Sequence, residues 1–222
     1  MSRVQNLEAS LLAFDSKNAE HFKQQLKLIH NSGIQNIHYD VMDGKNVPNV
    51  AFGTEWLKEL YLEGFNTTVH FMVNKPRKYF NHFCVFPFNS LSFQPEPISK
   101  LNALLLLKKI RKNGRKCGLA FKPNTNLLKY KRLIKQCDFV TIMGVEPGFG
   151  GQEFLKDLTL KNLRIINEIK KKINPNLIVE LDGGVNFDVI KLTSKYVDTY
   201  VSGSFLLKQK KPQELLDFIK SI

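Results

Sequence analysis

The segment NIHYDVMDG, residues 36–44, has the pattern of a buried strand and also carries side chains that can do chemistry. His38, Asp40 and Met42 alternate with apolar residues, so one strand face would be apolar and the other would present an imidazole, a carboxylate and a thioether. If both faces are covered, the ionisable pair needs a partner, because an unpaired buried charge is strongly unfavourable. The segment therefore predicts a ligand or metal site, with an edge strand that faces solvent as the alternative.

Three further predicted strands end in residues of a similar kind. The strand VHFMV carries His70 and Met72 on one face, and Met143 lies near the end of the predicted strand that leads into PGFGGQ. Asp182 directly follows the predicted strand that ends at Leu181 and precedes two glycines. If these strands are parallel and share a sheet, their carboxyl ends meet at one edge. Each residue taken singly is more often structural, but their shared position predicts one metal site with the ligands His38, Asp40, His70 and Asp182.

The predicted ligand set suits a small group of metals and one kind of reaction. Two imidazoles and two carboxylates bind Zn²⁺, Fe²⁺, Mn²⁺ or Co²⁺. If Asp40 and Asp182 lie on opposite sides of a bound carbon atom, one carboxylate can remove a proton while the other delivers one to the opposite face. A divalent metal that bridges a carbonyl and the adjacent hydroxyl would stabilise the enediolate in between. The sequence thus predicts an acid/base pair that inverts a stereocentre.

All three methionines after Met1 lie at predicted strand ends, namely Met42, Met72 and Met143. Filling of the core is the usual role of a methionine. Their shared place near the predicted metal site favours a soft, apolar wall around an electron-rich intermediate.

Glycine-rich loops follow the last three predicted strands. They read GFGG at Gly148–Gly151, DGG at Asp182–Gly184 and SGS at Ser202–Ser204. Backbone N–H groups in such turns can approach an anion closely. Because loops after late strands are the usual phosphate site of (β/α)8 barrels, we predict a phosphate site here. Ordinary turns are the alternative for each loop alone.

Short β-type runs alternate with amphipathic helical patterns along the chain. Eight strand–helix units in one small chain predict a parallel sheet closed into a compact (β/α)8 TIM barrel, of class α/β. An open doubly wound sheet is the alternative, but no GxGxxG motif opens the first helix. The predicted strands are Val4–Ala9, Asn36–Met42, Thr67–Val73, Ser90–Gln94, Lys116–Lys122, Phe139–Val145, Leu177–Leu181 and Thr199–Ser202. The predicted helices lie near Asn18–Ser32, Thr54–Glu63, Lys75–Phe83, Ile98–Lys112, Asn126–Lys135, Leu155–Ile173, Asn186–Ser194 and Pro212–Ile222.

The composition fits one globular domain over residues 1–222. Hydrophobic residues make up 43% of the chain and charged residues 24%, as is usual for such a domain. The N-terminus lacks the apolar region of a signal peptide, and the longest apolar run is too short to span a bilayer. The three cysteines are widely separated, which argues against a disulfide framework or a zinc cluster. We expect a cytoplasmic protein with no membrane partner.

The formal net charge of +13 raises the question of an acidic partner. Such a charge can indicate nucleic-acid binding or attraction of a small anionic substrate. Many lysines fall in helix-like segments such as KKIRKNGRK, Lys108–Lys116, where solvated helix faces explain them. No zinc-finger spacing, RNP-type aromatic strand or Arg-rich tract supports a nucleic-acid reader. We expect no nucleic-acid partner, and a basic nucleic-acid-binding barrel is the remote alternative.

Several motifs, in this order, resemble those of ribulose-phosphate 3-epimerases from Ser10 to about Phe205. They are SLLAFD at Ser10–Asp15, IHYDVMDGKNVPN at Ile37–Asn49, VHFMV at Val69–Val73, GLAFKPNT at Gly118–Thr125, PGFGGQ at Pro147–Gln152, ELDGGV at Glu180–Val185 and SGS. The resemblance implies a ribulose-phosphate-binding barrel, one divalent metal ion and a homo-oligomer. It implies interconversion of D-ribulose 5-phosphate and D-xylulose 5-phosphate in the pentose phosphate pathway. A D-allulose 6-phosphate 3-epimerase is the alternative, although the intact GFGG and DGG loops favour the pentulose enzyme.

The resemblance also implies a role for each site residue. The four predicted ligands would hold the metal, and Asp40 and Asp182 would be the catalytic acid/base pair. Ser10 and His70 would contact the sugar, and the loop at 148–151 would close over the substrate. The phosphate end would be bound by Gly148, Phe149, Gly150, Gly151, Gly183, Gly184, Gly203 and Ser204.

Four positions depart from the pattern usual in that family. Gln94 takes the place of a histidine, Ala13 of a serine, Gly144 of a threonine and Glu146 of an asparagine. None of these changes removes a predicted ligand or acid. We therefore expect them to affect the rate or the length of the sugar more than the type of reaction.

Overall fold

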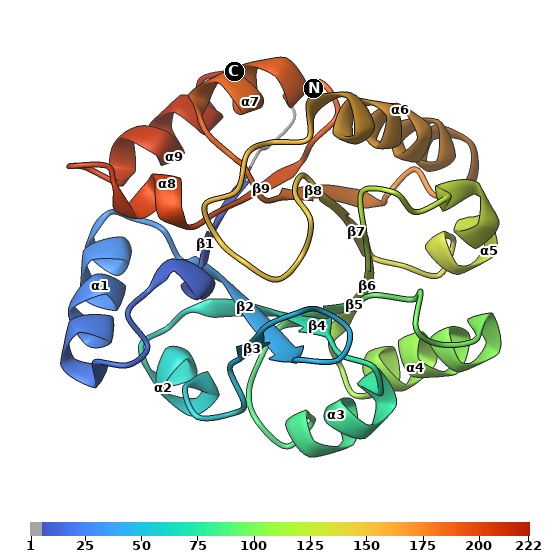
Figure 1. The fold of residues 1–222 in the computed structure, drawn as a ribbon, viewed down its shortest axis with the longest axis horizontal. Helices are drawn as coiled ribbons and strands as arrows, with labels where there is room; N and C mark the ends of the chain where they lie inside the picture. Colours follow the sequence, from blue (N-terminus) through green and yellow to red (C-terminus); the bar gives the residue numbers. More distant parts are fainter. Residues whose placement is uncertain (1–5) are drawn as a thin grey trace.

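In the computed structural model, which describes residues 6–222, eight parallel strands close into a barrel (Figure 1). These strands are β1 (Asn6–Ser10), β2 (Asn36–Asp43), β4 (Asn66–Met72), β5 (Ser90–Phe93), β6 (Lys116–Phe121), β7 (Phe139–Met143), β8 (Ile178–Asp182) and β9 (Thr199–Ser202). Their order is β1-β9-β8-β7-β6-β5-β4-β2, and the pairing of β1 with β2 closes the ring. A short strand, β3 (Val50–Ala51), adds antiparallel to the end of β2.

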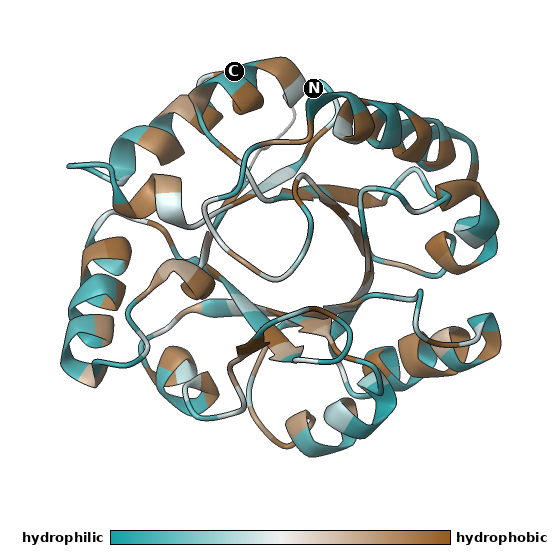
Figure 2. Ribbon diagram, viewed as in Figure 1, coloured by the Kyte–Doolittle hydropathy of each residue, from teal (hydrophilic) through white to brown (hydrophobic). Residues whose placement is uncertain are grey.

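Helices surround the barrel, and Figure 2 shows hydrophobic and hydrophilic sides on them. They are α1 (Ala19–Asn31), α2 (Leu57–Leu62), α3 (Pro76–Phe83), α4 (Lys100–Lys112), α5 (Lys131–Ile134), α6 (Lys156–Ile173), α7 (Phe187–Thr193), α8 (Ser204–Leu207) and α9 (Gln213–Lys220), with 3₁₀ turns η1 (Leu11–Ala13) and η2 (Leu127–Tyr130). On α4, the side chains of Lys108, Arg111 and Lys112 are exposed while Leu106 and Leu107 are buried. The explanation of the basic charge by solvated helix faces is thus confirmed for this helix.

The predicted (β/α)8 barrel is confirmed, and the differences lie in short elements. Val4 and Gln5 of the first predicted strand lie outside the described residues. The helix predicted at 126–135 is wrong in its first half: the Asn126 side chain accepts from the Leu128 N–H and starts a 3₁₀ turn, and the α-helix begins only at Lys131. The elements β3 and α8 were not predicted, because two or four residues are too few to show a period.

The two faces of strand β2 have different roles: one packs against apolar side chains, and the other carries ionisable side chains. The Tyr39 ring packs on Phe52 at 4.9 Å between centroids, and Phe52 packs in turn on Phe22 of α1. His38 and Asp40, on the opposite face, are 0% and 2% exposed. Because β2 pairs with β1 on one side and β4 on the other, the alternative of a solvent-facing edge strand is wrong.

Membrane-spanning helices and disulfides are both absent from the described residues, 6–222. Within residues 6–222, no helix is long and apolar enough to cross a membrane. Cys84, Cys117 and Cys137 are free thiols, as their spacing predicted.

Candidate active site

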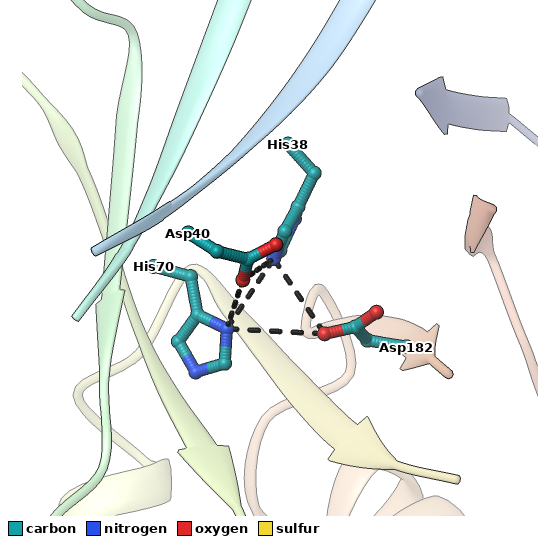
Figure 3. A group of neighbouring side chains, drawn as sticks. All are labelled: His38, Asp40, His70 and Asp182. Carbon is teal, nitrogen blue, oxygen red and sulfur yellow. Dashed lines mark hydrogen bonds and ion pairs between the residues drawn. The ribbon is translucent and has the colours of Figure 1, made fainter. Parts of the chain in front are cut away.

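Four side chains from three strands converge inside the barrel: His38 and Asp40 of β2, His70 of β4 and Asp182 of β8 (Figure 3). The ring nitrogens His38 Nε2 and His70 Nδ1 are 3.3 Å apart, and they lie 3.4 and 3.2 Å from Asp40 Oδ1. Asp182 Oδ2 lies 3.7 Å from His38 Nε2 and 3.8 Å from His70 Nδ1. One ligand atom of each residue therefore faces a common point.

The separations in this cluster are those of ligands around one divalent cation. Ligands at about 2.0–2.2 Å in a tetrahedral shell are roughly 3.3–3.6 Å apart. The separations between the candidate ligand atoms run from 3.2 Å (His70 Nδ1 to Asp40 Oδ1) to 3.8 Å (His70 Nδ1 to Asp182 Oδ2), and all four atoms lie within 4.8 Å of one another. Two imidazole nitrogens and two carboxylate oxygens are a set that Zn²⁺, Fe²⁺, Mn²⁺ and Co²⁺ accept. The four residues thus fit a divalent metal.

The hydrogen-bonding positions of the histidines agree with this interpretation. His38 Nδ1 lies 3.2 Å from Glu8 Oε2 on β1, so a proton on Nδ1 can be donated to Glu8 and leaves the Nε2 lone pair facing the cluster. His70 faces the cluster with Nδ1, and its buried Nε2 has no hydrogen-bond partner in the described part of the chain. Both rings can therefore present an unprotonated nitrogen to the same point.

The two aspartates lie in different electrostatic surroundings. Burial opposes ionisation of Asp40, but the charge of His38 and hydrogen bonds from His38 and His70 outweigh it and hold the pKa well below the usual range. At Asp182 burial dominates and raises the pKa to about 6, against the attraction of His38. Burial lowers the pKa of His38, yet Asp40 and Asp182 together raise it well above its ordinary value. Carboxyls whose pKa values are pushed apart are typical of an acid/base pair.

A cavity of about 230 Å³ lies at the carboxyl ends of the strands, next to the cluster. Ser10 Oγ, at its wall, donates a hydrogen bond to Asp40 Oδ2 at 3.1 Å. His38 and His70 are fully buried and are not part of the lining. The other predicted site residues all line it: Ser10, Asp40, Met42, Met72, Met143, Gly148, Phe149, Gly150, Gly151, Asp182, Gly183, Gly184, Gly203 and Ser204.

The loop after β8 requires its two glycines. Gly183 and Gly184 have φ angles of +97° and +69°, which residues with a Cβ rarely adopt. A Cβ on Gly183 would lie 2.5 Å from Val145 Cγ2, and one on Gly184 would lie 2.9 Å from Phe154 Cβ. The loop therefore packs tightly against the segment that follows β7, and it does so at the wall of the cavity.

The departure at Gln94 lies outside the cavity lining. The side chain is 1% exposed, and its Oε1 accepts a hydrogen bond from Asn46 Nδ2 at 2.5 Å. Lys122 Nζ donates to the Asn46 carbonyl at 3.2 Å. Further along the same loop, Asn49 Nδ2 donates to the Gly148 carbonyl at 2.7 Å. Gln94 thus holds the loop after β2, which in turn touches the glycine loop after β7.

Sequence reasoning missed three charged residues here: Glu8, Glu180 and Lys208. Glu180 Oε1 lies 3.8 Å from His38 Nδ1 and accepts from Thr141 Oγ1 at 2.7 Å. Burial, with the charge of Glu8, raises the pKa of Glu180 to about 8. The available signal was strand alternation, because each glutamate shares its strand face with a predicted site residue. Lys208, which lines the cavity, lies four residues after Ser204.

The fold and the four-residue cluster define an α/β-barrel protein with a candidate metal centre at the carboxyl ends of its strands. The chain belongs to the ribulose-phosphate 3-epimerase family, because the model described as "Ribulose-phosphate 3 epimerase family" matches residues 6–207. The ribulose-phosphate 3-epimerase of Mycoplasma genitalium is 38% identical over 200 residues, which are 89% of this chain and 92% of that protein. That of Aquifex aeolicus is 30% identical over 201 residues, 90% and 89% of the two chains. That of Escherichia coli K12 is 32% identical over 196 residues, 86% and 84%.

Solved structures with low sequence identity share the fold. A structure of Mycobacterium tuberculosis tryptophan synthase matches with a TM-score of 0.71 at 12% identity, over 98% of this chain and 93% of that chain. The tryptophan synthase alpha subunit of Campylobacter jejuni matches with a TM-score of 0.62 at 15% identity, over 100% and 96%. These matches support the barrel architecture alone.

Substitution of Gly144 tests how tightly the ends of β7 and β8 fit. Its N–H donates to the Asp182 carbonyl at 2.6 Å, and a Cβ there would lie 2.4 Å from the Gly183 carbonyl oxygen. This contact leaves no room for a side chain at position 144 in the present backbone arrangement. We expect Gly144→Ala to lower the free energy of unfolding by about 1–3 kcal/mol, measured by urea denaturation, because backbone must move.

The matched control for this variant is Gly150→Ala. A Cβ at Gly150 would lie 3.4 Å from Ser204 Oγ, an ordinary contact. The free energy of unfolding should change by less than about 1 kcal/mol in either direction. Equal destabilisation by the two substitutions would contradict the packing argument.

Proposed function

We propose that this chain, a member of the ribulose-phosphate 3-epimerase family, interconverts D-ribulose 5-phosphate and D-xylulose 5-phosphate by moving a proton at C3. The position of Asp40 and Asp182 carries the proposal. Both carboxyls belong to the candidate metal cluster, and both line the cavity whose remaining wall includes the glycine loops. The relatives with this printed name, matched over about nine-tenths of the chain, support the same reaction.

Asp40 and Asp182 are the proposed proton carriers. One carboxylate takes the C3 proton of one epimer, and the other carboxyl donates a proton to the opposite face of the same carbon, which inverts the stereocentre. The reverse reaction uses the same pair with the roles exchanged. Ser10 Oγ, hydrogen-bonded to Asp40 Oδ2 at 3.1 Å, orients that carboxyl and lies where it can contact the sugar.

His38, Asp40, His70 and Asp182 are the proposed ligands of one divalent ion. When bound, such an ion supplies Lewis-acid stabilisation of the negative charge that develops on substrate oxygen atoms. Around it, Met42, Met72 and Met143 form an apolar, polarisable wall of the cavity that excludes water. These methionines are each no more than 3% exposed.

The glycine loops are the proposed phosphate site, and the first of them is the proposed lid. Gly148–Gly151, Gly183–Gly184 and Gly203–Ser204 all line the cavity. Phe149, in the loop after β7, is 53% exposed. We expect this loop to close over the substrate, so that Phe149 becomes covered and water is kept from the reacting carbon.

Proton NMR of the metal-loaded protein with D-ribulose 5-phosphate in D2O tests the proposed reaction. The expected result is enzyme-dependent formation of D-xylulose 5-phosphate with deuterium at C3. Absence of both product and exchange would show that the pentulose assignment is wrong. D-Allulose 6-phosphate is the next substrate, and its conversion would identify the hexulose enzyme.

Glu8→Ala is expected to weaken metal binding about 10- to 100-fold, because His38 loses the carboxylate that orients its ring. A competition titration with a metallochromic dye gives the dissociation constant for Zn²⁺. Glu63→Ala removes an equally charged but exposed side chain, and should leave this constant unchanged. If Glu8→Ala binds Zn²⁺ as tightly as the wild type, the proposed orientation of His38 is wrong.

The location and assembly of the protein remain predictions. We expect a cytoplasmic homo-oligomer that acts on a small phosphorylated ketose, with neither a nucleic acid nor a membrane as partner. Analytical ultracentrifugation would determine the oligomeric state.

A further inference from the structure

One cationic side chain lines the cavity of the proposed active site. Among the lining residues, all within the described part of the chain, Lys208 is the only lysine or arginine, whereas Asp40 and Asp182 are acidic. A phosphomonoester carries a charge of about −1.5 to −2 near neutral pH. Without Lys208, the cavity lining would meet that charge with backbone N–H groups, hydroxyls and side-chain amides, none of which carries a positive charge.

Lys208 lines the same cavity as the glycine loops, and its position on α8 places it near them. It is the C-cap of α8, with helical φ and ψ of −78° and −13°, and follows Ser204 by four residues. Residues four apart lie on the same helix face. Ser204 Oγ in turn lies 3.4 and 3.7 Å from the points that an added Cβ would occupy at Gly150 and Gly151. Ser204 therefore lies beside the glycine loop, and Lys208 extends the same helix face by one turn.

We propose that Lys208 is a substrate-binding residue whose Nζ pairs with the phosphate group, and that it selects phosphorylated over unphosphorylated ketoses. The proposal rests on the proposed function of this cavity. Charge-assisted hydrogen bonds are stronger than neutral ones. Lysine also places its ammonium group on a flexible stem, and the side chain of Lys208 is exposed, so it can move onto a ligand without a backbone change.

The test is a comparison of Lys208→Met, which keeps most of the stem and removes the charge, with wild type. For D-ribulose 5-phosphate we expect KM to rise about tenfold, as for loss of one hydrogen bond to a charged group, with little change in kcat. For unphosphorylated D-ribulose, kcat/KM should be the same in both proteins. Lys208→Arg should restore most of the affinity. Lys210→Ala and Lys211→Ala, which remove exposed lysines outside the lining, should leave KM unchanged.

A binding measurement separates this proposal from the proposed reaction. Calorimetric titration with inorganic phosphate should give a dissociation constant several-fold higher for Lys208→Met than for wild type. If wild type fails to epimerise but shows this difference, the reaction is wrong and the role of Lys208 stands. Equal phosphate binding by the two proteins, no phosphate binding to either, or equal losses with both sugars would overturn the role of Lys208.

Discussion

Asp182→Asn is expected to lower the interconversion of D-ribulose 5-phosphate and D-xylulose 5-phosphate by about 10²–10⁴-fold, the usual contribution of a general acid or base. The barrel should remain folded, because asparagine has the same size and a neutral amide avoids the cost of burying a charge at this position. Burial raises the pKa of this carboxyl to about 6, unlike that of Asp40. The NMR assay in D2O measures the rate, and near-UV circular dichroism checks the fold.

The matched control is Asp188→Asn, which removes an exposed carboxylate from the first turn of α7. This variant should epimerise like the wild type, since Asp188 does not line the cavity. Near-normal turnover by Asp182→Asn would contradict the two-base mechanism. A loss of rate together with a collapsed near-UV spectrum would instead mean that Asp182 is needed for folding.

The barrel could be predicted because its signals are local. Period-two runs such as residues 36–42 and the helical patterns between them are set by which faces are buried. The structure confirms the eight strands and the helical segments between them, except that the segment predicted at 126–135 begins as a 3₁₀ turn. Parallel strands place their carboxyl ends at one mouth of the barrel. The strand-end positions therefore predicted that the four residues of the cluster lie together, namely His38, Asp40, His70 and Asp182. No spacing in the sequence could give the 3.2–3.8 Å separations, which depend on register and side-chain rotamer.

The charged residues that were missed show where such reasoning stops. Glu8 sits in a strand of five residues, and only the closure of β1 onto β2 brings it to His38, 30 residues away in sequence. Lys208 lies beyond the SGS motif, at the C-cap of a one-turn helix that has no visible period. Strand alternation places Glu8 on the same strand face as Ser10, but its approach to His38 depends on a long-range strand pairing, and the position of Lys208 depends on a short element.

Removal of the metal is expected to abolish epimerisation and to lower Tm, and readdition should restore both. Asp40 and Asp182 are 2% and 9% exposed, so loss of a bound divalent cation leaves two buried carboxyls with a weaker counter-charge, that of His38. A ligand at a thousand times its dissociation constant stabilises the native state by about 4 kcal/mol. For a chain of this size that corresponds to a Tm difference of roughly 10 °C. Dialysis against a chelator, elemental analysis and scanning calorimetry provide the measurement.

Two histidine variants test whether metal binding at the cluster causes the difference in Tm between metal-loaded and metal-free protein. His70→Ala removes one proposed ligand and should lose most of the metal-dependent rise in Tm, whereas His21→Ala, at an exposed site on α1, should keep it. A purely structural hydrogen-bonded cluster would behave otherwise: His70→Ala would lower Tm equally with and without metal. Full activity in a sample shown to be metal-free, or an undiminished metal-dependent rise in Tm in His70→Ala, would therefore reject the proposed ligands. Only a cation held by this cluster would make both the epimerisation rate and Tm depend on the metal.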